Sequence, residues 1–370
     1  MQLVNATPFS ASYSGGLLKS GRRCVVIVAK ATFKIPDSAR MEPVIHETQV
    51  EPFFSDSFFG DPAKSAPKFE TDFAPIKRRC DVILHGAAYA PNDEPVIEVA
   101  VGFQVGAVNK QFYVLGERQW EKDFFGGLRP SPIHPFLRQP FSYDVAYGGT
   151  DRTKSDKDKV AVYMQNPVGV GYSPYTRPEG EQAPITEAFK QRITRPIGNY
   201  KPMSFGPIAR NWEPRLQYTG TYDQHWKEEV SPFLPDDFDE RYYQCAPEDQ
   251  QTDYLKGGER VVLTGLTPQG RCDFRIPNIN IPMTAIMENS ERRRLNPVID
   301  TLCLEPDEGR FTLVWRTHLG IRQRTSEIDT LLVGNPSRGW EHARTVGKPY
   351  VAMERLGAFT ARLRHYMREA

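Results

Sequence analysis

The chain has little of what marks the most familiar functional classes. Its net charge is only +1, from 47 basic and 46 acidic residues, whereas proteins that bind nucleic acids or membrane surfaces usually carry a strong basic bias. No run approaches the roughly 18 apolar residues of a membrane span, and no basic stretch followed by an apolar core opens the sequence. We therefore expect a cytoplasmic protein whose partner is neither nucleic acid nor membrane.

Cysteine is scarce as well. The five cysteines are odd in number, lie far apart and include no Cys-x-x-Cys pair. This pattern is typical of reduced, mostly buried thiols in a cytosolic protein. They are Cys24, Cys80, Cys245, Cys272 and Cys303.

The short motifs of common enzymes are also missing. The sequence has no phosphate-binding glycine loop, no Gly-x-Ser-x-Gly elbow and no His-Glu-x-x-His pair. The acids within residues 236–240 lack the twelve-residue glycine-bearing loop of an EF-hand, so we interpret them as caps of a turn. We expect no cofactor and no metal site.

What the chain does have is turns and aromatic residues. It contains 31 prolines and 28 glycines spread along its length, which predicts many turns and few long helices. Aromatic residues make up 11% of the chain, which argues against disorder. With 370 residues, two lobes are the usual expectation, although one large β architecture also fits.

Several segments have the character of strands. Residues 22–33 are rich in β-branched side chains and suit a buried strand, and residues 81–90 form a second candidate. In residues 95–105 the apolar side chains alternate, and the set that we expect to face the core is Ile97, Val99, Val101 and Phe103. Asn109 and Lys110 are expected to turn the chain into a hairpin with residues 111–115.

The pattern then changes along the chain. Residues 116–258 form a loop-rich central region, in which turn signals recur every few residues between aromatic anchors. Loops this long are usually functional. The expected division is an N-terminal β-rich part (1–115), the central region (116–258), a C-terminal β-rich part (259–334) and a helical tail (335–370). In the C-terminal β-rich part we predict strands at 259–266, 271–276, 300–304 and 311–318.

The tail carries a helical period. Apolar side chains recur every three or four residues in 349–370, which predicts an amphipathic helix that docks on the sheet or recruits a partner. They are Ala352, Leu356, Phe359, Leu363 and Tyr366. The predicted fold is thus mainly β, with β-sandwich-like sheets, long ordered aromatic-rich loops and a C-terminal amphipathic helix.

The richest segment for function is residues 220–243, which combines aromatics, acids and prolines without a helical or strand period. Trp, Tyr and Arg are the side chains that most often anchor protein interfaces. Around half of the aromatic residues here are expected simply to pin the loops to the core. The residues predicted to bind a partner or to order these loops are Trp212, Arg215, Tyr222, Asp223, Trp226, Asp237 and Phe238.

An enzymatic alternative stays open. A β scaffold with an aromatic and acidic groove suits a carbohydrate- or cell-wall-acting enzyme, because glycosidases need only two carboxyl groups at a suitable separation. The candidate carboxylates are Glu213, Asp223, Asp237 and Asp239.

Ordered short motifs along nearly the whole chain resemble the bacterial domain-of-unknown-function family 2169. Each motif is short, but together and in this order they are specific to the family. The clearest pieces are residues 29–33, 70–77, 80–82, 116–120, 143–149, 166–171, 205–208, 212–215, 220–223, 234–239 and 246–251. The stretch beyond about Arg322 lies outside the motif-rich part.

This resemblance implies a cellular role but no catalytic reaction. Proteins similar to this one are encoded beside type VI secretion components, near spike proteins of the VgrG and PAAR types and their toxic cargo. The implied role is a cytoplasmic adaptor or chaperone that binds an effector toxin and helps load it onto the spike. The family has no established catalytic residues that could be transferred. A third hypothesis is that the protein is itself a structural or exported part of the secretion apparatus.

Overall fold

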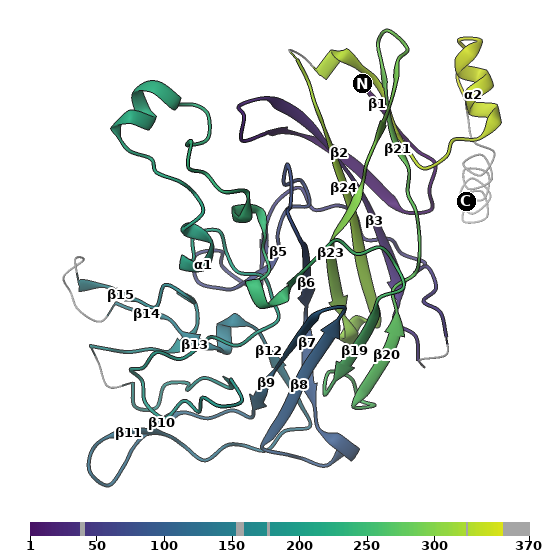
Figure 1. Cartoon of the computed structure of the whole chain (residues 1–370). Coiled ribbons are helices and arrows are strands. Elements are labelled where there is room, and N and C mark those ends of the chain that lie inside the picture. The colour runs from purple at the N-terminus through teal and green to yellow at the C-terminus, as the bar shows by residue number, and fades with distance from the viewer. Residues whose placement is uncertain (38–40, 153–158, 176–177, 323–324, 351–370) are drawn as a thin grey trace, which may run out of the picture.

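The computed structural model describes residues 1–37, 41–152, 159–175, 178–322 and 325–350. Strands dominate it, and they form three larger sheets with several short two-stranded ribbons around them (Figure 1). The expected mainly β fold is confirmed. Within the part of the chain that is described, no helix is long and apolar enough to cross a membrane.

The largest sheet has six strands in the order β18-β6-β23-β24-β3-β2. Neighbouring strands are antiparallel except β6 and β23, which are parallel. Its strands are β2 (Ser10–Leu17), β3 (Arg23–Lys34), β6 (Cys80–Leu84), β18 (Gln251–Thr252), β23 (Val298–Glu305) and β24 (Arg310–Gly320). The β-branched run of β3 lies at the interior of this sheet, where both of its faces are covered and such side chains pack well.

A second, antiparallel sheet has five strands in the order β17-β9-β8-β19-β20. They are β8 (Glu98–Val105), β9 (Val108–Leu115), β17 (Thr186–Glu187), β19 (Arg260–Thr264) and β20 (Arg271–Arg275). As the alternation predicts, Val99, Val101 and Phe103 are buried, whereas Ile97 precedes the strand and is half exposed. The predicted turn at Asn109 and Lys110 is wrong, because the chain reverses earlier, at a left-handed Gly106.

A third sheet has four strands in the order β1-β25-β21-β22. They are β1 (Gln2–Asn5), β21 (Met283–Met287), β22 (Arg292–Leu295) and β25 (Ile328–Val333). β22 is an edge strand with arginines at three of its four positions, and charge on an edge discourages pairing with other chains.

The three sheets share one continuous apolar core. Phe311 of β24 packs against Phe274 of β20 with ring centroids 5.1 Å apart, and Leu331 of β25 lies in the same core. The six-stranded sheet therefore packs face to face against the other two, as a β-sandwich does. β-Strands from the N-terminal and the C-terminal β-rich parts pair with each other in all three sheets.

The central region adds mostly short ribbons and loops around this sandwich. The remaining strands of the structure are β4 (Ser57–Phe58), β5 (Pro67–Phe69), β7 (Gly86–Tyr89), β10 (Trp120–Lys122), β11 (Leu128–Pro130), β12 (Arg138–Phe141), β13 (Tyr147–Gly148), β14 (Thr150–Asp151), β15 (Ala161–Val162) and β16 (Val170–Gly171). One strand over residues 81–90 is wrong: the chain breaks at His85, and β7 leaves the large sheet to pair with β12.

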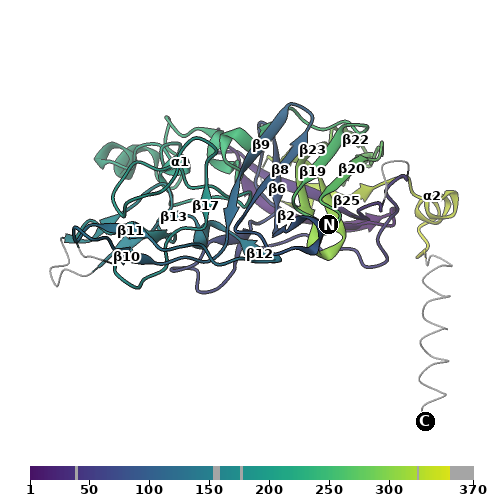
Figure 2. The same ribbon diagram turned by 90° about the horizontal axis from the view of Figure 1, so that it is seen from below.

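Among the residues that the structure describes, helices are few and short. The α-helices are α1 (Glu213–Leu216) and α2 (Arg338–Thr345), and Trp226–Val230 forms a π-helical turn, η4. Single 3₁₀ turns occur at η1 (Pro91–Asp93), η2 (Tyr143–Val145), η5 (Glu240–Tyr243), η6 (Glu248–Gln250), η7 (Pro306–Glu308) and η8 (Thr325–Glu327). The amphipathic helix predicted for 349–370 lies almost wholly outside the described residues. In Figure 2, α2 lies at one end of the molecule and the central region at the other.

Candidate functional site

A small apolar cluster holds segments of the central loops to one another. Trp212 is 2% exposed and meets Tyr143 edge-on at 5.4 Å, beside Ala146 and Ile208. α1 begins directly after Trp212, with Pro214 in its first turn, where proline's missing N–H costs nothing. Trp212 therefore orders the loops and is not available to a partner.

Arg215 holds the same loops from within α1. It is buried, and Glu70 accepts hydrogen bonds from Nη1 at 2.5 Å and from Nη2 at 3.0 Å. The guanidinium also donates to the carbonyl oxygens of Ile208 and Tyr242. Burial alone would raise the pKa of Glu70, but the charge and hydrogen bonds of Arg215 lower it. Removing one partner of a buried ion pair typically costs about 3–5 kcal/mol, so this pair is a structural clamp.

Phe238 is the third buried residue of the predicted set. Its ring is 2% exposed and lies 5.8 Å from Tyr242 and 5.5 Å from Tyr243. Asp239 caps the next turn, η5, by accepting from the backbone N–H of Arg241. Phe238 thus closes the loop that leads away from the sheets.

Between these anchors the chain makes one exposed excursion, residues 217–239, which we term the aromatic lobe (Figure 1, upper left). Tyr222 is 50% exposed and Phe233 49% exposed. The partly exposed ring of Trp226 lies 4.7 Å from Tyr222, and its Nε1 donates to the carbonyl of Phe233 at 2.9 Å. A Cβ added to Gly21 in the β2–β3 turn would lie 3.0 Å from the Phe233 ring, so the lobe also touches the large sheet there.

The predicted carboxylates of the lobe are engaged locally. Asp223 accepts from the backbone N–H of Trp226 at 2.9 Å. Asp237 accepts from the backbone N–H and the hydroxyl of Thr221 at 2.9 and 2.8 Å, and these bonds lower its pKa. A side-chain hydrogen bond from Arg241 lowers the pKa of Asp239. A general acid of a glycosidase needs a raised pKa, whereas the pKa values of Asp237 and Asp239 are lowered.

The fourth candidate carboxylate, Glu213, is exposed at the start of α1. A carboxylate in the first turn of a helix interacts favourably with the unpaired N–H groups there. The position gives Glu213 a local structural role.

The aromatic lobe is strongly acidic. Within 217–239 six carboxylates face one lysine, Lys227, which gives a formal charge of −5 in a chain whose total is +1. The carboxylates are Asp223, Glu228, Glu229, Asp236, Asp237 and Asp239. Exposed aromatic rings within an acidic field form a surface that suits a basic, partly apolar protein segment.

A buried charge network lies beneath the loops, on the outer face of the six-stranded sheet. Lys77 donates to Asp81 at 2.6 Å and to the hydroxyl of Thr301 at 3.1 Å, and Asp81 also accepts from Gln244 and the backbone N–H of Cys245. Burial alone would lower the pKa of Lys77, but the attraction of the Asp81 carboxylate together with the other nearby acidic groups outweighs this effect, and the pKa of Lys77 lies above its ordinary range. The network joins the central loops to β6 and β23.

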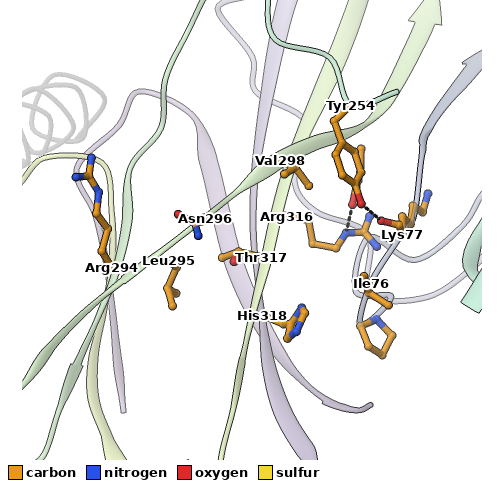
Figure 3. Close-up of a pocket in the computed structure, with 12 residues that line it drawn as sticks. Ile76, Lys77, Tyr254, Arg294, Leu295, Asn296, Val298, Arg316, Thr317 and His318 are labelled. Carbon is orange, nitrogen blue, oxygen red and sulfur yellow. Dashed lines mark hydrogen bonds and ion pairs between the residues drawn. The ribbon is translucent and has the colours of Figure 1, made fainter. Parts of the chain in front are cut away.

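A cavity of about 360 Å³ lies beside this network (Figure 3). Arg316 extends from β24 toward Lys77 and Tyr254, on the side of the cavity away from Arg294. Its Nε lies 3.0 Å from a carboxylate oxygen of Asp300, and both side chains are buried. The charge on this wall is therefore already paired within the protein, and none of the predicted site residues lines the cavity.

The fold and the site together define a β-sandwich protein whose central loops present an aromatic, acidic lobe. The family described as "Uncharacterized protein conserved in bacteria (DUF2169)" matches residues 20–316, and the chain belongs to it. No curated protein and no solved structure matches the chain.

The sequence motifs of the family resemblance meet in this structure. Glu70, from the piece 70–77, pairs with Arg215, from the piece 212–215. In the same way Gln250, from the piece 246–251, donates to the carbonyl of Val82 at 2.8 Å. Motifs more than a hundred residues apart thus form the contacts that fix the loops.

Sequence reasoning missed two features. The first is the buried charge network, because a hydrophobic pattern assigns lysine and aspartate to the surface. The second is the pair Phe124 and Phe125, which are 97% and 92% exposed. The signal for the second was present: two adjacent aromatic residues between an aspartate and two glycines indicate a turn, not a core strand.

Proposed function

We propose that this protein is a non-enzymatic, cytoplasmic adaptor that binds a type VI secretion effector toxin and helps load it onto the VgrG/PAAR spike. The observation that carries the proposal is the aromatic lobe, on which Tyr222 and Phe233 are exposed and Trp226 is partly exposed. The secretion role follows from the family resemblance, and the protein-binding role from the lobe.

The lobe has the composition of a protein-binding surface. Trp and Tyr supply large contact area, and a few such residues usually carry most of the binding free energy. Contiguous exposed aromatic surface on a folded protein marks an interaction site more often than single exposed residues do. Exposure of these rings to water is unfavourable in free energy, so a partner that covers them gains binding free energy by removing their apolar surface from water.

The base of the lobe is pre-ordered. Trp212 and Phe238 are buried on either side of it, and Arg215 locks α1 to Glu70. A surface held in place before binding loses less conformational entropy when a partner docks. The lobe is thus a firm platform with a small number of exposed anchors.

The charge of the lobe specifies the partner. Its formal charge of −5 favours a client segment that carries Lys or Arg beside apolar side chains. Attraction between such surfaces speeds association and weakens as salt is raised. An adaptor also has to release its client to the spike, which suits an affinity in the micromolar to nanomolar range, about −8 to −12 kcal/mol.

The test measures binding of the purified protein to the effector and to the spike protein that are encoded beside it, by isothermal titration. We expect Trp226→Ala to weaken client binding about 10- to 100-fold, because truncation removes a central anchor. The matched control is Trp340→Ala, which removes a partly exposed tryptophan from α2 at the far end of the molecule and should leave affinity unchanged. Equal affinities for wild type and Trp226→Ala would remove the lobe from the interface.

The same preparation separates the other hypotheses. If the wild-type protein binds neither neighbour, the adaptor role fails. Hydrolysis of a glycan panel that is lost in Asp223→Asn or Asp237→Asn would establish the enzyme instead. Recovery of the protein in the secreted fraction, and not only in the cell lysate, would favour an exported component.

A further inference from the structure

The hairpin formed by β10 and β11 carries an apolar tip. Phe124 and Phe125 are 97% and 92% exposed, far more than any other phenylalanine among the described residues. Almost complete exposure of two adjacent aromatic rings is costly, and such a patch usually marks a binding surface. The tip lies at the end of the molecule opposite α2 (Figure 2).

The tip, residues 123–127, is a defined turn. Asp123 Oδ1 accepts from the backbone N–H of Phe125 at 2.9 Å and of Gly127 at 2.7 Å. The backbone N–H of Asp123 donates to the carbonyl of Gly127 at 2.8 Å, and Gly126 adopts φ +77°. The two rings stand edge to face at 5.5 Å. The rings are therefore presented by an ordered turn and form a small convex knob.

The root of the hairpin is anchored. Trp120 at the start of β10 is 1% exposed, and it packs with Tyr147, Ala183 and Ile193 in one apolar cluster. Its backbone N–H donates to the carbonyl of Glu181 at 2.9 Å. The knob is therefore fixed relative to the body of the protein.

A cavity of about 720 Å³ lies directly beside the knob, and we call it the hollow. Ile197 on its wall is 60% exposed. The residues that matter for its chemistry are the apolar Leu128, Pro174, Pro196 and Ile197 and the charged Asp123 and Arg195. Knob and hollow share the same surface, because Asp123 and Leu128 belong to both the hairpin and the wall.

We propose that this face is the interface of a homodimer, in which the Phe124–Phe125 knob of each copy inserts into the hollow of the other. An isologous interface needs one patch that is complementary to itself, and a knob beside a hollow meets that need under a two-fold rotation. Asp123 and Arg195 give the hollow charges of both signs, so the patch is also self-complementary in charge.

The charges of the hairpin favour a protein copy over an anionic membrane. Lys122 pairs with Glu179, and Arg129 pairs with Glu121 at 3.0 Å. Each cation of the hairpin thus has an acidic partner within the chain, whereas docking on anionic lipid draws on unpaired basic residues.

The areas are adequate for a dimer of moderate strength. Aromatic side chains bury about 150–250 Å² each, so four rings supply about 600–1,000 Å². A stable interface buries about 1,200–2,000 Å² in total, and the walls of the two hollows supply the rest. We expect a dissociation constant of about micromolar order.

The experiment is sedimentation velocity on the full chain at about 1 to 100 µM. Wild type should change from the monomer mass of 42.1 kDa toward twice that value as concentration rises. The knob variant Phe124→Ser/Phe125→Ser and the hollow variant Ile197→Asp should both stay monomeric. The control Val44→Ser, which changes a 57% exposed side chain elsewhere, should dimerise like wild type.

Two further outcomes sharpen the result. A mixture of the knob and hollow variants keeps one intact knob and one intact hollow, so it should associate more than either variant alone. Unchanged circular dichroism spectra and melting temperatures keep misfolding from explaining a monomer. Three results overturn the proposal. The wild type stays monomeric at every concentration, the knob variant dimerises like wild type, or the mixture associates no more than either variant alone. Monomeric wild type that floats with phosphatidylserine vesicles would assign the knob to lipid instead.

Discussion

Single buried side chains decide where the long loops of this protein lie. Arg215 uses all three guanidinium nitrogens on Glu70 and two backbone carbonyls, and Lys77 is held by Asp81 and Thr301. Each pair joins segments far apart in sequence, or a loop to a strand. Hydrogen bonds to buried charges depend on fixed geometry, so these residues specify one arrangement of loops that have little regular structure.

His85, at the break between β6 and β7, makes the stability of the folded protein dependent on pH. Its Nε2 has no hydrogen-bond partner among the described residues, and its ring meets Phe69 edge-on at 5.0 Å. Burial lowers the pKa of His85 to about 4, against 6.5 for the free side chain. Between pH 4 and pH 6.5 this histidine is protonated in the unfolded chain and neutral in the folded chain. The free energy of unfolding therefore falls as the pH drops from 6.5 to 4.

We expect His85→Gln to remove this component. Between pH 7 and pH 4, the unfolding free energy of wild type should fall by about 2–3 kcal/mol more than that of the variant. Urea denaturation at a series of pH values measures the difference. The control His225→Gln changes an exposed histidine of the aromatic lobe and should follow wild type. Parallel pH profiles for wild type and His85→Gln would mean that the imidazole is not shielded in the folded state.

At the scale of elements, the aromatic lobe depends on one close approach at its neck. Gly220 has φ +80°, and a Cβ there would lie 2.7 Å from Asp237 Oδ1 and 2.9 Å from Pro235 Cβ. Gly220→Ala is expected to push the two sides of the lobe apart, at a local cost of about 1–3 kcal/mol. Amide hydrogen exchange should speed up about 5- to 100-fold within residues 221–237 and stay unchanged in β3 and β24.

The matched control for this change is Gly258→Ala. Gly258 has φ +87°, but nothing lies within 4 Å of an added Cβ. This substitution imposes a similar backbone strain outside the lobe, so exchange in 221–237 should not change. If Gly220→Ala also leaves exchange there unchanged, the neck is looser than its contacts indicate.

The sequence predicts some elements of this fold better than others, and for physical reasons. β3 and β8 follow from β-branched content and alternation, since packing in a sheet selects those patterns directly. The sequence does not predict β22 as a strand, because three arginines in a row have the pattern of a solvated turn, whereas an edge strand tolerates them. The sequence pattern places the turn after β8 at Asn109, which has the stronger local signal, whereas the structure turns at Gly106, which takes the left-handed position.

Local sequence patterns are limited in the same way at the candidate site. The sequence indicated that residues 212–238 combine anchors and exposed side chains, but not which are which. Trp212 and Trp226 have the same chemistry in sequence, yet one is buried beside Tyr143 and the other lies on the lobe. That division arises from contacts with residues far away along the chain, which local patterns do not contain.

At the scale of the whole molecule, the sandwich supports two separate surfaces. The aromatic lobe is held at its base by the Arg215–Glu70 pair and the cluster around Trp212, whereas the Phe124–Phe125 knob is rooted in the cluster around Trp120. The two roots belong to different apolar clusters. Changes at sites without shared partners usually act independently. The two proposals together assign dimerisation to one surface and client binding to the other.

Independence of the two surfaces is the last prediction. The hollow variant Ile197→Asp should bind the client in solution with an affinity within about two-fold of wild type, while Trp226→Ala should dimerise normally. Titration calorimetry with a soluble, single-copy client avoids the gain that two linked sites show on an immobilised partner. If Ile197→Asp weakens client binding as much as Trp226→Ala does, client capture requires the dimer, and the knob and the lobe act as one composite site. If each variant loses only its own interaction, the sandwich is a rigid spacer between a self-association surface and a client-binding surface.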